Sequence, residues 1–202
     1  IDQADNEGFT PCHAAAQEGH ANIVLALADL GADVIKVEVQ RRGDHVRSTA
    51  NQQGGLSASF LNNNRNKRSI TLNLKDEKGR AVLHRLAVGA DVLVQNFRPG
   101  VVERLGIGEK DIRSIASNII YVSMSGFGSK GPYVHKPVYD PIVQAVSGLA
   151  SLQGGGDDQR PRLVRTVVAD KVAALTVSQA ITAALLARER TGQGQHIDLS
   201  ML

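Results

Sequence analysis

An aspartate at the head of a long apolar segment is the strongest candidate for a reactive group. Asp170 opens the run "DKVAALTVSQAITAALLARERTGQG" (170–194), which we predict to be a helix. A helix N-terminus favours a negative charge, and a well-placed, ionised carboxylate is a competent nucleophile for covalent catalysis. Aspartate is also a preferred helix cap. From position alone, both a structural and a catalytic role are open.

A glycine-rich turn offers a second element of reaction chemistry. The segment "SGFGSKGP" (Ser125–Pro132) comes at the end of a predicted strand, 118–128. Backbone amides in such a turn are able to stabilise an oxyanion when a carbonyl is attacked. A plain turn without a catalytic role is the alternative interpretation.

Alternating strands and helices must position these residues. Apolar runs predict strands at 32–39, 68–74, 90–97 and 118–128, and helices are predicted at 75–89 and 139–156. This alternation predicts a doubly wound α/β fold with a mostly parallel sheet. Ligands bind such sheets at the carboxyl ends of the strands. We therefore expect the site in the segments that follow the strands, "QRRGDHVR", "KDEKG", "NFRPG" and "SGFGSKGP".

The composition argues against several classes of function. Of 202 residues, 42% are hydrophobic and 21% are charged, which is typical of a globular domain. Aromatic residues make up only 3%, and surfaces for single-stranded nucleic acid stack bases on aromatic rings. No apolar run reaches the roughly 18–20 residues of a membrane span, and the single cysteine, Cys12, fits a reducing compartment. We expect a cytoplasmic protein without nucleic-acid or membrane partners.

The first part of the chain resembles an ankyrin repeat. Residues 5–34 carry that family's turn and helix start at Gly8, Thr10, Pro11 and His13. Ankyrin units recur about every 33 residues, and at least about three are needed to bury their apolar faces. No second copy follows, so a helical flank packed on the sheet is the favoured interpretation, with a protein-interaction module as the alternative. We place the ankyrin-like segment at residues 1–26.

From about residue 27 to residue 202 the sequence closely resembles another family. Its landmarks are, in order, "LADLGADVIKVE", "GD" with Arg47, "LNNNRNKRSITLNLKDEKGR", "ADVLVQNFRPGVVERLG", "IIYVSMSGFGSKGP", "YDPIVQAVSGL" and "ALLARERTGQGQHIDLSML". They are similar to those of the class III coenzyme A transferases, which include formyl-CoA transferase and carnitine-CoA transferase. The resemblance implies a Rossmann-like domain in a homodimer. Its substrates are acyl-CoA and a small carboxylic acid, with no permanently bound cofactor and no metal.

The resemblance also implies roles for particular residues. Asp170 matches the family's nucleophile, whose carboxylate attacks the acyl-CoA thioester to give a mixed anhydride; the released CoA thiolate then forms an aspartyl-CoA thioester. Contacts with CoA are implied for Leu72, Leu74, Lys75, Asn96, Phe97, Arg98, Arg104, Val138 and Tyr139. Lys75, Arg104 and Tyr139 are the strongest candidates among them.

A racemase is the alternative enzyme within the same fold family. The α-methylacyl-CoA racemases need an acid/base pair beside the α-carbon, and in them a histidine stands directly before the aspartate of the "YD" pair. Here that position is Tyr139, whose ordinary pKa of about 10 suits a base poorly at neutral pH. His135 lies four residues earlier and does not match. The sequence therefore favours the transferase.

The resemblance also predicts elements that residues 1–202 do not contain. Family members begin with a strand and a loop ahead of "LADLGADVIKVE", and they continue after "SML" into a small domain with a glycine-rich active-site loop. We therefore expect a partial large domain at 27–202, without its first strand and without the small C-terminal domain. Loss of that strand leaves a neighbouring strand with unpaired backbone groups. We expect this chain, taken alone, to form the aspartyl thioester poorly.

Overall fold

The computed structural model describes residues 31–49, 52–155 and 159–202, so the predicted ankyrin-like segment at 1–26 lies outside the described residues. The strands are β1 (Val34–Val39), β2 (Gln52–Gln53), β3 (Leu56–Ser57), β4 (Lys67–Leu72), β5 (Val92–Gln95), β6 (Ile120–Ser125) and β7 (His196–Ser200). The helices are the short 3-10 helix η1 (His45–Ser48), α2 (Ala58–Asn63), α3 (Glu77–Val88), α4 (Val101–Arg104), α5 (Glu109–Ile115), α6 (Asp140–Val146), α7 (Leu149–Gly154) and α8 (Val168–Thr191).

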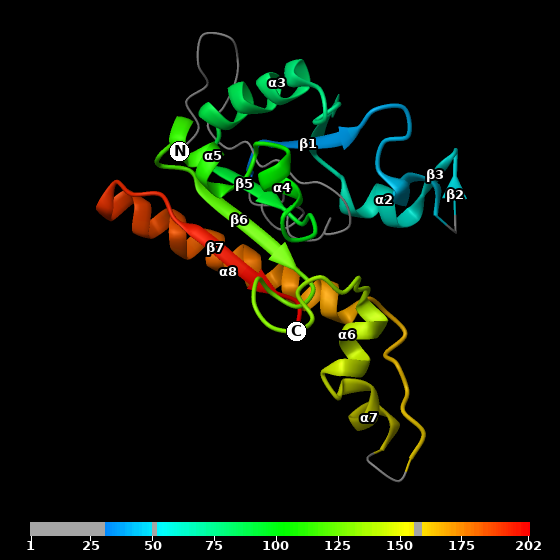
Figure 1. Ribbon diagram of the computed structural model, residues 1–202. Helices are drawn as coiled ribbons and strands as arrows, with labels where there is room; N and C mark the ends of the chain where they lie inside the picture. The colour runs from blue at the N-terminus through cyan, green and yellow to red at the C-terminus, as the bar shows by residue number, and fades with distance from the viewer. Residues whose placement is uncertain (1–30, 50–51, 156–158) are drawn as a thin grey trace.

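Parallel pairing organises the longer strands. β1 pairs with β4, and β6 lies between β5 and β7, all in parallel. β2 and β3 form a short antiparallel hairpin beside α2 (Figure 1). The larger sheet lies between α8 on one side and α3 and α5 on the other (Figure 1). The predicted α/β fold with parallel sheets and flanking helices is confirmed.

Alternate residues of β6 enter two different cores. Val122 packs in the cluster that contains Val177 of α8, whereas Tyr121 belongs to the cluster that contains Leu83 of α3 and Ile112 of α5. Successive side chains of a strand point to opposite faces of its sheet. A central parallel strand covered on both faces explains why "IIYVSM" is almost continuously apolar.

The two parallel sheets meet between β1 and β5. Within the described ranges these two strands share no backbone pairing, yet Val34 joins the cluster under α8 and Val37 the cluster under α3. A small apolar cavity is lined from β1, α3 and β5, with Val37, Leu83 and Leu93 among its residues. The parallel sheet of the described chain is therefore in two parts that share their cores.

Two helix predictions differ from the structure. The predicted helix at 139–156 is two helices, α6 and α7, because Gly148 between them adopts a left-handed conformation (φ 81°) that interrupts a helix. The last helix begins at Val168 rather than at Asp170, so Asp170 lies in its first turn and is not its cap. Gly192, with φ 71°, ends α8 in the way glycine commonly ends helices.

α8 has one buried face and one exposed face. Ala173, Val177 and Ile181 are buried in the core, whereas Val172 and Leu175 are 57% and 61% exposed. Among the described helices, α8 is the one long and apolar enough to cross a membrane by length and composition. Its packing against β6 and β7 is that of a core helix. The inner face of α8 is therefore part of the core, whereas its outer face is open to solvent in the described chain.

Buried charges hold the loop after β1. Glu38, 3% exposed, accepts hydrogen bonds from the Arg47 guanidinium (2.7 and 2.8 Å) and from the Asp44 amide (2.7 Å). Lys36 forms a buried ion pair with Asp44. The ammonium of Lys36 and the guanidinium of Arg47 lie 4.9 Å and 4.1 Å from the centre of the Phe60 ring. The "GD" and Arg47 landmark thus has a structural role, because these contacts fix the loop beside the carboxyl end of β1.

The charge of Glu38 is expected to make stability depend on pH. Burial raises the pKa of Glu38, but hydrogen bonds from Arg47, Ser69 and the Asp44 amide outweigh burial and lower it from 4.5 to about 2. A lowered carboxyl pKa contributes stability that is complete above pH 4.5 and is lost as the pH falls toward 2. Glu38→Gln should therefore unfold in less urea than the native chain at neutral pH, with a difference that shrinks in acid.

Urea unfolding followed by circular dichroism across this pH range measures the effect. Glu189→Gln, on an exposed position of α8, is the control and should show no pH-dependent difference. A Glu38→Gln variant as stable as the native chain at neutral pH would contradict the role assigned to Glu38.

Candidate active site

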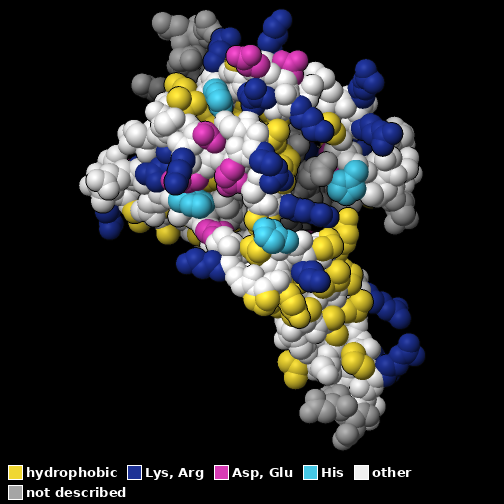
Figure 2. Space-filling model, viewed as in Figure 1, with side chains coloured by type: hydrophobic (Ala, Val, Ile, Leu, Met, Phe, Trp, Pro, Cys, Tyr) yellow, Lys and Arg dark blue, Asp and Glu magenta, His cyan; other side chains and the backbone are white. Residues whose placement is uncertain are grey.

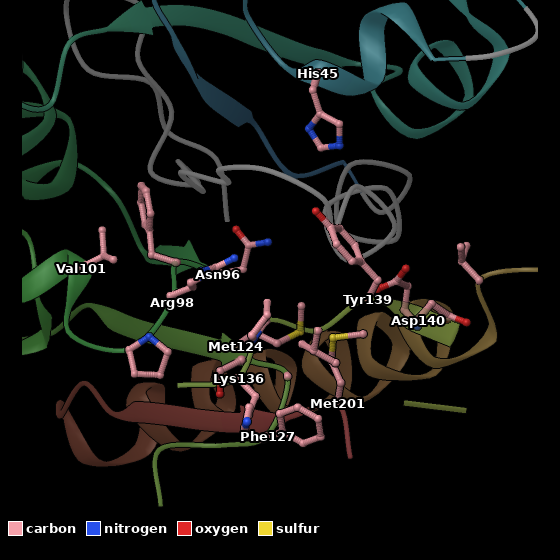
Figure 3. A pocket seen from close by; sticks show the side chains of 18 of the residues that line it. His45, Asn96, Arg98, Val101, Met124, Phe127, Lys136, Tyr139, Asp140 and Met201 are labelled. Carbon is pink, nitrogen blue, oxygen red and sulfur yellow. Dashed lines mark hydrogen bonds between the residues drawn. The ribbon is translucent and has the colours of Figure 1, made fainter. Parts of the chain in front are cut away.

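A pocket of about 600 Å³ lies at the carboxyl ends of the parallel strands (Figure 3). Its walls come from the loops after β1, β5 and β6, from α2, from residue 134 and residues 136–140, and from the start of α8. Met201, directly after β7, also lines the pocket. The sequence-based expectation that the site follows the strand ends agrees with this position.

The structure brings together most of the residues singled out from the sequence. Those that line the pocket are Asn96, Phe97, Arg98, Val138, Tyr139 and Asp170. Those that are not among its described lining are Leu72, Leu74, Lys75 and Arg104. The side chains of Leu72 and Leu74 are buried in the core beneath α3, and those of Lys75 and Arg104 are exposed. CoA contacts at all of these positions remain predictions.

The loop after β5 is anchored by the last residue of that strand. Gln95 is 7% exposed; its side-chain oxygen accepts a hydrogen bond from the Phe97 amide (2.9 Å), and its side-chain nitrogen donates to Ser123 Oγ (3.0 Å). This holds the backbone at the start of the loop that carries Asn96 and Arg98 to the pocket. Gly100, with φ 83°, then allows the sharp entry into α4.

Asp170 has a neighbouring carboxylate. Asp140, 4% exposed, accepts a hydrogen bond from the Asp170 backbone N–H through Oδ2 (3.0 Å). Burial, and after it the charge of Asp140, raises the pKa of Asp170 from 3.8 to about 6. A carboxyl with this pKa is still mostly ionised at neutral pH, by about ten to one, and is more basic than an ordinary aspartate.

The turn after β6 approaches the opposite wall closely. A Cβ on Gly126 would lie 1.8 Å from Cγ1 of Val138, so only glycine fits between the two segments. Ser125 precedes it on the pocket wall, and its Oγ is buried without a hydrogen-bond partner within the described chain. Buried polar atoms are rarely left unpaired, so Ser125 is a position where a bound molecule would gain a hydrogen bond.

Sequence reasoning missed several pocket residues. Asp44 and His45 reach the pocket from the loop after β1, and Lys136 reaches it from the segment before α6; Figure 3 shows His45 above the pocket and Lys136 below it. The signal for the first two was present, because "QRRGDHVR" follows a predicted strand. Lys136 follows no strand directly, and nothing in its sequence spacing distinguishes it from a surface lysine.

The comparisons with known proteins agree on one family. Residues 22–202 match the sequence model of CoA-transferase family III. The chain is 46% identical over 175 residues to acetyl-CoA:oxalate CoA-transferase of Acetobacter aceti, with 87% of this chain and 45% of that protein covered. It is 43% identical over 181 residues to succinyl-CoA:glutarate CoA-transferase of Mus musculus, with 88% and 41% covered. The chain thus spans about half the length of these relatives.

Solved structures show the same relationship. A CAIB/BAIF family protein from Brucella suis superposes with a TM-score of 0.87 at 35% identity, covering 94% of this chain and 52% of that one. Rv3272 from Mycobacterium tuberculosis superposes with a TM-score of 0.85 at 32% identity, covering 100% and 55%. On the match over residues 22–202, together with the shared fold, the chain belongs to CoA-transferase family III.

Proposed function

We propose that the chain carries the CoA-binding and nucleophilic part of an acyl-CoA:carboxylate CoA-transferase. The observation that supports this most is the place of Asp170 on the wall of the 600 Å³ pocket, with a pKa raised to about 6 by burial and by Asp140. General bases and nucleophiles work best when their pKa lies near the working pH, because they are then both ionised and basic. The relatives named above are CoA-transferases, which supports the same reaction class.

The proposed transfer uses only bonds that the two substrates and Asp170 supply. The Asp170 carboxylate attacks the thioester carbonyl, the C–S bond breaks, and CoA leaves as the thiolate from a mixed anhydride. The thiolate then attacks the Asp170 carbonyl, which releases the donor's carboxylate and leaves an aspartyl-CoA thioester. The acceptor carboxylate attacks this thioester, and the same two steps in reverse yield the new acyl-CoA and restore Asp170.

We propose that the charged and the apolar walls of the pocket contact different parts of CoA. Arg98 and Lys136 are its basic groups from the loop after β5 and the segment before α6, and they suit phosphate oxygens (Figure 3). Phe97, Met124 and Val138 supply apolar surface, which suits the pantetheine arm.

The transferase is favoured over the racemase by the residue directly before Asp140, which is Tyr139 and not a histidine. His135 is exposed and is not among the described residues that line the pocket, whereas Tyr139 lies on its wall directly before Asp140. A racemase would need a base at that position.

We also propose a homodimer in the cytoplasm. α6 and α7 form an arm, residues 140–155, that extends from the body of the protein, and hydrophobic side chains gather over it (Figures 1 and 2). Ile142 and Leu152 on the arm are 41% and 77% exposed, as are Val172 and Leu175 on α8 at 57% and 61%. Exposed apolar surface of this kind favours a protein partner.

A transfer assay tests the proposed reaction. The chain is incubated with acetyl-CoA and oxalate, and separately with succinyl-CoA and glutarate, the pairs that name the two relatives. Mass spectrometry should detect a new thioester that contains the acceptor acid. Release of free CoA and donor acid without a new thioester would contradict transfer and indicate a hydrolase.

Arg98 is expected to contribute strongly to CoA affinity. Arg98→Ala removes a charge-assisted contact with phosphate and should weaken CoA binding by about 10- to 100-fold in isothermal titration. Arg85→Ala, which removes the same charge from an exposed position of α3, is the matched control and should bind CoA normally. Equal losses in the two variants would show that Arg98 acts only through net charge. Normal binding by Arg98→Ala would place CoA elsewhere.

A further inference from the structure

The N-terminus of α8 is capped by a residue of another helix. The residue at the cap position, Val167, has no side-chain group that can accept a hydrogen bond. Asp140, in the first turn of α6, supplies that acceptor instead, through the 3.0 Å hydrogen bond from the Asp170 N–H to its Oδ2. Asp170 is the third residue of α8, a position whose amide a capping side chain normally serves.

A second buried side chain extends this connection. Gln144, one turn along α6 and 2% exposed, donates to Asp140 Oδ1 (2.5 Å). Its side-chain oxygen accepts from the Val164 N–H (2.8 Å), and its side-chain nitrogen also lies 3.2 Å from the Thr166 carbonyl oxygen. The segment that leads into α8 and the first turn of α8 are thus bound to the same face of α6.

We propose that Asp140 and Gln144 are positioning residues for Asp170, with Asp140 also tuning its charge. Both hold the start of α8 on α6, so that α6 determines where the Asp170 carboxyl lies in the pocket. Asp140 adds a negative charge beside that carboxyl, whereas Gln144 is neutral and acts through geometry alone. The inference rests on the proposed nucleophilic role of Asp170.

The charge effect has a definite direction. The titratable and charged groups on the pocket wall around Asp170 are Asp44, His45, Arg98, Lys136, Tyr139 and Asp140, and Lys171 on α8 donates to Thr166 Oγ1 (3.0 Å). Within the described residues, Asp140 is the neighbour whose charge adds to burial in raising the pKa of Asp170. A neutral side chain at 140 should therefore lower this pKa from about 6 toward 3.8, without reaching it, because burial remains.

The test separates charge from geometry. Protein labelled with ¹³C at aspartate carboxyls is titrated by NMR without CoA, and Asp170→Asn identifies the Asp170 signal. Asp140→Asn and Asp140→Ser both remove the charge, and either one that folds is sufficient. Gln144→Met breaks the link and keeps the charge. Covalent adduct formation with acetyl-CoA is then measured for each variant across pH.

We expect a lower titration midpoint for Asp170 in the Asp140 variants and an unchanged midpoint in Gln144→Met. Adduct formation by Gln144→Met should fall by about 10- to 100-fold at every pH, the cost of misplacing a reacting group. An Asp170 midpoint that does not move in the Asp140 variants, or that moves equally in Gln144→Met, would overturn the proposal. If the midpoint moves as expected but the protein forms no adduct, the effect of Asp140 on the pKa of Asp170 is supported and the acyl-transfer function is overturned instead.

Discussion

Replacement of Asp170 by alanine is expected to lower the rate of CoA transfer by about 10³-fold or more, because it removes the nucleophile and with it both covalent intermediates. CoA affinity should change little, since binding is assigned to the loop after β5 and to Lys136. The measurement is the rate at which the acceptor acid appears as a thioester, followed by mass spectrometry. CoA affinity is measured in parallel by isothermal titration.

A matched aspartate provides the control for this result. Asp198 lies on β7, is exposed, and is not among the described pocket residues. Asp198→Ala should therefore transfer CoA at the rate of the native chain. Transfer by Asp170→Ala at a comparable rate would show that the carboxyl is a structural part of α8 and that the chemistry proceeds without it.

The second large effect is expected on stability, from the buried ion pair next to β1. The side chains of Lys36 and Asp44 are only 7% and 4% exposed, and Asp44→Ala would leave the Lys36 ammonium buried without its counter-charge. Loss of one partner of a buried pair costs about 3–5 kcal/mol of the free energy of unfolding. Urea unfolding at neutral pH, without ligand, measures this difference.

A more exposed ion pair near the start of β1 gives the comparison. Asp33 and Arg68 are 2.5 Å apart, with side chains that are 23% and 48% exposed. Asp33→Ala should cost only about 0–1 kcal/mol, because water solvates the arginine that remains. If Asp33→Ala and Asp44→Ala lower the free energy of unfolding by similar amounts, burial of Lys36 does not have the importance given to it.

Much of the fold was predictable from local patterns. Parallel strands buried on both faces give continuous apolar runs such as "IIYVSM", and a chain that alternates strands with helices has few other arrangements. The break at Gly148 was harder to predict, because glycine is tolerated within helices and its left-handed conformation depends on how α6 and α7 pack. The start of α8 at Val168 was missed because its capping group lies thirty residues earlier in the chain, at Asp140.

The candidate site, like the fold, was predictable from the sequence only in part. Asn96 and Arg98 directly follow a strand, so the strand-end rule leads to them. Ser125 opens the turn "SGFGSKGP" after a predicted strand, so the same rule leads to it. The place of Lys136 in the pocket and the contact of Asp140 with Asp170 depend on how separate segments approach one another, and no sequence spacing reports such an approach. Asp170 was found from its place in a motif, while its raised pKa follows from burial and from Asp140, both of which exist only in the folded chain.

The most direct measurement is to find which atom of the protein becomes attached to CoA. The native chain is incubated with acetyl-CoA, digested at acidic pH and mapped by mass spectrometry. The proposed mechanism predicts CoA joined to the Asp170 peptide with loss of one water, even at low occupancy, and no such peptide from Asp170→Ala. CoA or acyl groups attached only to other residues, or an equal adduct in Asp170→Ala, would contradict the assignment of Asp170 as the nucleophile.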